Sequence, residues 1–116
     1  MEEQPRNVSE KTVVRAGSYL NKLSGERIER ECRLRLEAGC RLLVVDFRET
    51  EMVNSIGIAI LLGIIEAAQQ AGARVVFSAV NVQTAALFEM LGLTRYVSMS
   101  EESLDAPLRP GWPLDC

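Results

Sequence analysis

Histidine is absent from this 116-residue chain. Its absence removes the commonest general base and the commonest metal ligand of proteins. Cysteine is scarce, and the spacing of its three residues fits neither a disulfide framework nor a metal site. We therefore predict reduced thiols, with Cys32 serving as a small buried hydrophobe.

A strong excess of charge of one sign is also lacking. Lys and Arg number 13 against 16 Asp and Glu, a formal net charge of -3. Basic residues alternate with acids in 27–35 instead of forming a patch, which argues against nucleic acid as a partner. Residues 1–10 contain no apolar signal region, and the apolar run Ile56–Ile65 is too short to span a bilayer. We predict a cytoplasmic protein that does not insert into membranes.

Motifs of nucleotide binding and of hydrolysis are missing. The spacing of Gly57, Gly63 and Gly72 does not match the glycine-rich loops that bind the phosphates of nucleotides. Ser55 lacks the preceding glycine of a nucleophile elbow, and no histidine is available as its base. Glu49 and Glu51 form a carboxylate pair whose simplest interpretation is solvated turn acids. We expect no enzyme and no cofactor.

Alternating strand and helix patterns fill the middle of the chain. Strands are predicted around 12–14, 42–47, 73–80 and 95–98, and helices around 25–38, 55–71 and 82–91. Such alternation indicates βαβ units. We predict an α/β fold, a small mixed sheet of about four strands packed with about four helices. The domain is expected over residues 11–106, between a flexible N-terminus, 1–10, and a flexible C-terminal tail, 107–116.

The helix predicted over 25–38 has a regular pattern. Ser24 is the expected N-cap, and Gly39 follows the last turn. Its core stripe is Ile28, Cys32 and Leu36. Its acid-first i, i+4 pairs are Glu26–Arg30, Glu29–Arg33 and Glu31–Arg35, which predict a solvated, self-paired face.

The helix predicted over 55–71 exposes a serine beside apolar residues. At 100° per residue one face carries Ser55, Ala59, Leu62, Glu66, Gln69 and Gln70. Three of these are strongly polar, so this face is expected to meet water. The opposite face supplies the core with Ile60, Leu61, Ile64, Ile65, Ala67 and Ala68. The exposed face is therefore a small, partly apolar docking surface.

Ser55 has two interpretations, a helix cap and a phosphate acceptor. Ser and Asn at helix starts are most often caps, which stabilise by about 0.5–2 kcal/mol. Asn54 is the better cap, which leaves the Ser55 hydroxyl free. A phosphate there would add about -1.5 to -2 charges near Glu49 and Glu51, changing surface potential more than stability. Thr50 and Ser24 are alternative acceptors.

Three segments resemble the STAS domain family of anti-sigma-factor antagonists, over residues 11–98. Asp46 followed by Asn54–Gly57 and an apolar helix is similar to the family's Asp-Ser-Ser-Gly motif. Ser18–Asn21 resembles its Gly-Glu-Leu-Asp turn, and Phe88–Leu93 resembles its last helix. Asn54 stands where the family usually has Asp, and Ile56 replaces the second Ser or Thr.

The resemblance implies partner switching without catalysis. The unphosphorylated antagonist would bind an anti-sigma factor that is also a serine kinase. That kinase would phosphorylate Ser55, and a PP2C-type phosphatase would reverse the modification. The implied partner-binding residues are Asn21, Asn54, Ser55, Ile56, Gly57, Ala59 and Leu62.

Three alternatives remain open. A second copy of the chain is a further candidate partner. The chain is otherwise a constitutive scaffold subunit of a stressosome-like or lipid-transport complex, with Ser55 only a helix-start residue. A small hydrolase is the remaining hypothesis.

Overall fold

The computed structural model describes residues 11–100, and the predicted flexible ends, 1–10 and 107–116, lie outside the described residues. The elements in chain order are β1 (Thr12–Arg15), β2 (Tyr19–Leu20), α2 (Lys22–Glu37), β3 (Leu42–Asp46), β4 (Met52–Val53), α3 (Ser55–Ala71), β5 (Arg74–Ser78), α4 (Val82–Met90), the 3-10 helix η1 (Leu93–Arg95) and β6 (Ser98–Ser100). The predicted alternation of strands and helices is confirmed.

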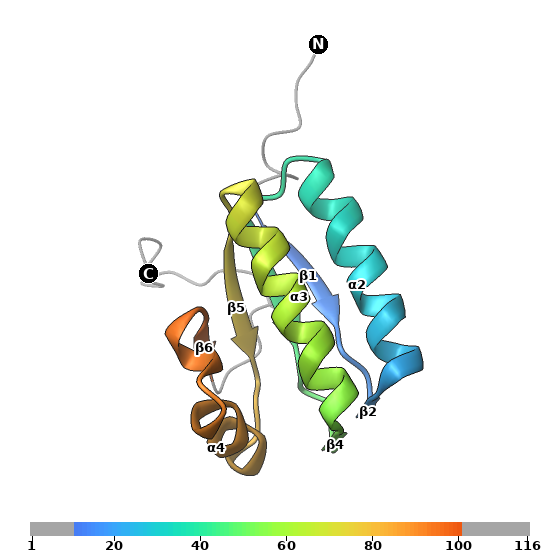
Figure 1. The fold of residues 1–116 in the computed structure, drawn as a ribbon, viewed down its shortest axis with the longest axis vertical. Helices are drawn as coiled ribbons and strands as arrows, with labels where there is room; N and C mark the ends of the chain where they lie inside the picture. Colours follow the sequence, from blue (N-terminus) through green and yellow to red (C-terminus); the bar gives the residue numbers. More distant parts are fainter. Residues whose placement is uncertain (1–10, 101–116) are drawn as a thin grey trace, which may run out of the picture.

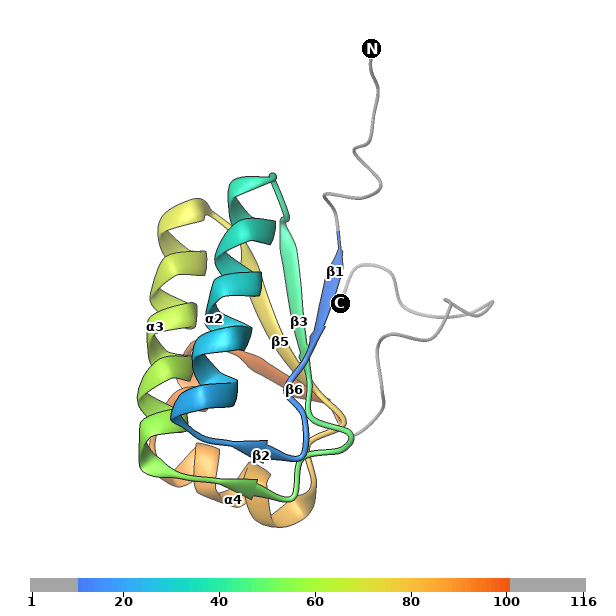
Figure 2. The same cartoon turned by 90° about the vertical axis from the view of Figure 1, so that its right-hand side faces the viewer.

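Four strands form the main sheet in the order β1-β3-β5-β6, and β2 pairs with β4 in a separate two-stranded ladder. Helices α2 and α3 lie side by side on one face of the main sheet (Figures 1 and 2).

The prediction of a mixed sheet is wrong for residues 11–100, because every pair there is parallel. Long crossovers through helices return the chain in the same direction and so produce parallel pairs. This part of the chain has three α-helices and one 3-10 helix instead of about four helices.

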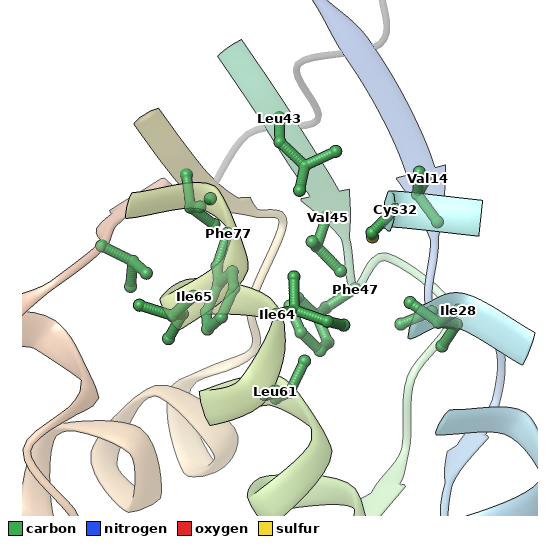
Figure 3. Packing of buried hydrophobic residues seen from close by; sticks show 14 of the residues in the cluster. Val14, Ile28, Cys32, Leu43, Val45, Phe47, Leu61, Ile64, Ile65 and Phe77 are labelled. Carbon is green, nitrogen blue, oxygen red and sulfur yellow. The ribbon is translucent and has the colours of Figure 1, made fainter. Parts of the chain in front are cut away.

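The core lies between this sheet and the two helices (Figure 3). Alternate residues of β3, Leu43 and Val45, point toward α2 and α3. In the same core the rings of Phe47, Phe77 and Phe88 pack with centroids 5.0–5.5 Å apart. No helix of the described part is long and apolar enough to cross a membrane.

The buried stripe of α2 is confirmed, since Ile28, Cys32 and Leu36 are all buried. Burial, with a smaller contribution from the nearby Glu31 carboxylate, raises the pKa of the Cys32 thiol to about 12. Cys32 is thus a protonated, buried hydrophobe, as predicted.

The polar face of α2 is paired largely as predicted. Glu29 and Arg33 lie 3.0 Å apart, and Glu31 and Arg35 lie 3.6 Å apart. The pair Glu26–Arg30 is wrong, because Glu26 contacts Lys22 at 3.1 Å instead. Lys22 is available since the helix begins three residues earlier than predicted.

The last predicted strand, 95–98, is also misplaced. Gly92 adopts the left-handed conformation, with φ of 85°, and directs the chain into η1. The amide groups of Tyr96 and Val97 both donate to the carbonyl of Leu93. Arg95 therefore still belongs to this turn, and strand pairing starts only at Ser98.

Candidate functional site

The starts of α2 and α3 are held together by the short ladder of β2 and β4. Tyr19 lies opposite Met52, and Leu20 lies opposite Val53. The amide of Asn54 donates to the Leu20 carbonyl at 3.0 Å, which extends the ladder by one bond. Because each strand leads directly into its helix, the two helices begin side by side (Figure 2).

An asparagine caps each of these helices. The Oδ1 atom of Asn54 accepts from the Gly57 amide at 2.8 Å, so the predicted cap of α3 is confirmed. The predicted cap of α2, Ser24, is wrong. Asn21 caps this helix, with its Oδ1 accepting from the Ser24 amide at 3.0 Å, while the Ser24 Oγ accepts from the Asn21 amide. This reciprocal pair is a capping box, with Ser in the place of the usual Glu or Gln.

Ser55 is the first helical residue of α3 and is exposed. Within residues 11–100 its hydroxyl makes no hydrogen bond. The two alternative acceptors are engaged: the Thr50 hydroxyl is buried and donates to the Gly17 carbonyl at 2.5 Å, and the Ser24 hydroxyl donates to the Tyr19 carbonyl at 2.6 Å. Of the three hydroxyls, only that of Ser55 is both accessible and unbonded.

Gly57 is buried and does not contribute to the exposed surface, although it was among the predicted partner-binding residues. A Cβ atom at this position would lie 2.6 Å from the Leu20 carbonyl oxygen. The missing side chain lets α3 approach β2 closely. Gly57 therefore positions the start of α3, where Ser55 lies.

The exposed face of α3 has the predicted composition. Ala59 is exposed, and Ile56 and Leu62 are 47% and 43% exposed. The polar residues farther along this face, Glu66, Gln69 and Gln70, are exposed as well. On the predicted core face, four residues are buried: Leu61, Ile64, Ile65 and Ala68. The other two, Ile60 and Ala67, are half-buried.

Tyr19, Leu23 and Met52 are exposed apolar residues that sequence reasoning missed. Tyr19 and Met52 are 40% and 59% exposed and face each other across the ladder that leads into the two helices. Leu23, in the first turn of α2, is 80% exposed. The alternation of exposed Tyr19 with buried Leu20 was the available signal, but it covers only two residues. We call Tyr19, Met52, Ile56, Ala59 and Leu62 the apolar surface around Ser55.

The start of α3 places backbone amides that precede the helical ladder next to the Ser55 hydroxyl. The first helical bond joins the Ile58 amide to the Asn54 carbonyl, so the amides of Ser55 and Ile56 precede the helical ladder. Such groups attract anions at helix starts. The cation in the first turn of α2, Lys22, is paired with Glu26.

Asp46, the acid that begins the family-like motif, is buried at the end of β3. Its Oδ1 atom accepts from the Arg48 amide at 2.9 Å, and its Oδ2 atom lies 3.5 Å from the Arg15 guanidinium. The first contact fixes the turn that follows β3, and the second joins β3 to β1.

Comparison with known proteins identifies the family to which this chain belongs. The family model of the STAS domain matches residues 1–106. No curated protein sequence matches the chain. A candidate anti-sigma factor antagonist of Thermotoga maritima has 12% identity and a TM-score of 0.71, covering 82% of this chain and 81% of that one.

Two further solved structures share the fold. The unphosphorylated anti-sigma factor antagonist SpoIIAA has 17% identity and a TM-score of 0.66, with 78% of this chain and 80% of that one covered. The STAS domain of a SulP transporter from Vibrio cholerae has 17% identity and a TM-score of 0.69, with 86% and 77% covered. At these identities the structural likeness establishes the fold, and the family model covers most of the sequence. This chain belongs to the STAS domain family.

Proposed function

We propose that this chain is a cytoplasmic anti-sigma-factor antagonist that works by partner switching. It binds an anti-sigma factor that is also a serine kinase, and phosphorylation of Ser55 ends the interaction. A PP2C-type phosphatase restores the binding form. The chain itself is a binding module that needs no cofactor.

The observation that carries this proposal is the state of Ser55. Its hydroxyl is exposed and unbonded within residues 11–100, while the hydroxyls of Thr50 and Ser24 are engaged. It lies at the start of α3, beside Ile56 and in line with Leu62, so a partner that covers the apolar surface also covers Ser55. A kinase that docks there can reach the hydroxyl it modifies.

Phosphorylation at this position changes charge more than fold. Asn54 already accepts from Gly57, so the phosphate is not needed as a cap. It would add about -1.5 to -2 charges to a chain with a formal net charge of -3. A dianion in the middle of an apolar contact must be desolvated on binding, which is costly. The modified form is therefore expected to keep its fold and lose its partner.

Affinity capture from the native cells tests the proposal. The baits are wild type, Ser55→Ala and Ser55→Asp, with Gln83→Glu as a control that places the same charge on an exposed side chain of α4. Wild type, Ser55→Ala and Gln83→Glu should capture the same kinase, and Ser55→Asp should capture at least about tenfold less, the equivalent of losing roughly 1.4 kcal/mol of binding.

A second assay follows phosphate transfer. With ATP, the captured kinase should phosphorylate wild type and leave Ser55→Ala unmodified. Equal capture by wild type and Ser55→Asp would refute the switch.

A constitutive scaffold is the second candidate function, and the likeness to transporter STAS domains favours it. In that case the apolar surface is buried permanently against a partner subunit, and Ser55 only begins a helix. Capture would then be indifferent to Ser55→Ala and Ser55→Asp but sensitive to Leu62→Asp. A second copy of this chain is a further candidate occupant, detected by sedimentation of the wild-type protein.

A further inference from the structure

A cavity lies at the far end of α3 from Ser55. It has a volume of about 330 Å³ and is formed by the last turns of α3, the start of β5, and the segment from η1 into β6. Gln69, one of its lining residues, is roughly 21 Å from Ser55 along the helix axis. Figure 1 shows α3 running from β4 at one end of the domain to the opposite end. This cavity is therefore separate from the apolar surface around Ser55.

The cavity combines an apolar floor with a polar wall. Ile65, Val75 and Val97 line it and are buried. Exposed polar side chains surround this floor: Gln69, Arg74, Thr94, Arg95, Tyr96 and Ser98. The lining is thus mainly polar, and the volume lies at the lower end of the range of small-molecule sites.

The lining of this cavity is positively charged. Arg74 and Arg95 both line it, and no carboxylate of residues 11–100 does. Neither arginine has an ion pair within residues 11–100, whereas Arg33 and Arg35 of α2 each contact a glutamate. The single acid of α3, Glu66, is not among the lining residues. In a chain with more acids than bases, two uncompensated arginines are concentrated here.

We propose that this cavity binds a small organic molecule through a phosphate group. Two guanidinium groups match the charge of a phosphate monoester, which is about -1.5 to -2 at neutral pH. Arginine forms paired hydrogen bonds to phosphate oxygens, and the Thr94, Tyr96 and Ser98 hydroxyls supply further donors. The apolar floor receives the organic part of the ligand. Such a ligand would bind at one end of a domain whose other end is proposed to bind a partner protein.

Titration of the full chain with phenyl phosphate, followed by amide chemical shifts, tests this site. Shifts are expected at Arg74 and over 94–98, with little change at Ser55. Arg74→Gln and Arg95→Gln should each weaken binding by roughly tenfold or more, since each removes a charge-assisted contact. Arg30→Gln, a matched loss of one exposed charge on α2, should leave the dissociation constant within about twofold, because screening weakens distant charges.

Two further probes separate the parts of the ligand. Phenol lacks the charge and should not bind measurably, and inorganic phosphate lacks the ring and should bind roughly tenfold more weakly. Phenol binding as tightly as phenyl phosphate would overturn the phosphate assignment, and equal binding of inorganic phosphate would overturn the organic part. Shifts confined to the start of α3, or an equal effect of Arg30→Gln, would overturn the site itself.

Discussion

Replacing Gly57 with alanine should loosen the part of the fold that positions Ser55. An added Cβ would lie 2.6 Å from the Leu20 carbonyl oxygen and 2.9 Å from its Cγ atom. The Leu20 carbonyl cannot move aside easily, because it accepts from the Asn54 amide at 3.0 Å and Leu20 is fully buried. The whole start of α3 must therefore shift away from β2.

The expected magnitude is the difference between two effects. Alanine is favoured over glycine within a helix by about 1 kcal/mol, and less in a first turn. Forcing a methyl group into a packed interior costs about 1–3 kcal/mol. The net loss of stability should be about 1–2 kcal/mol, which lowers Tm by roughly 5–10 °C in a domain of this size.

Gly63 provides the matched control for this measurement. It lies in the same helix, but within residues 11–100 a Cβ there would meet only the Glu29 Oε2 atom, at 3.7 Å. Gly63→Ala should therefore raise stability, by up to about 1 kcal/mol. Urea unfolding followed by circular dichroism measures both variants against wild type. If Gly57→Ala proved as stable as Gly63→Ala, the close approach of α3 to β2 would be refuted.

Three further predictions concern stability. Asn54→Ala removes the cap of α3 and should cost about 0.5–2 kcal/mol in urea unfolding; no change would mean that Asn54 does not cap. The raised pKa of Cys32, about 12 against an ordinary 9.0, means that the folded state holds this proton more tightly. The contribution of the protonated Cys32 thiol to the free energy of unfolding should thus be fully present below about pH 9 and be lost as the pH rises toward 12. An equally steep fall of stability in Cys32→Ala would exclude this cause. Among residues 11–100 the buried hydroxyl of Ser78 has no hydrogen-bond partner, so Ser78→Ala should leave stability unchanged or raise it, and a large loss of stability would contradict this.

Local sequence signals predicted α3 well. Asn54 precedes a continuous apolar helix, and the cap geometry follows from that local pattern. The division of α3 into a buried and an exposed face follows from helical periodicity alone. Gly72 ends the helix in the left-handed conformation, as glycine commonly does.

One local ambiguity and several tertiary contacts account for what the sequence did not predict. The capping box of α2 places Asn21 three residues before Ser24, and a serine at the later position is easily taken for the cap itself. The pairing of Tyr19 with Met52 joins two strands of two residues each, too short for an alternation pattern to register. For that reason the part of the apolar surface outside α3 was missed. Gly57 was listed among the partner-binding residues because its close approach to Leu20 depends on the same ladder, which the sequence did not reveal.

Phosphosite mapping by peptide mass spectrometry tests the central claim most directly. The protein would be isolated from its native cells at rest and under stress, and the modified fraction of the peptide that contains Ser55 would be measured. We predict phosphate on Ser55, in a fraction that changes with condition, and none on Thr50 or Ser24. A fully covered peptide that is never modified at Ser55 would contradict the switch and favour the constitutive binding module.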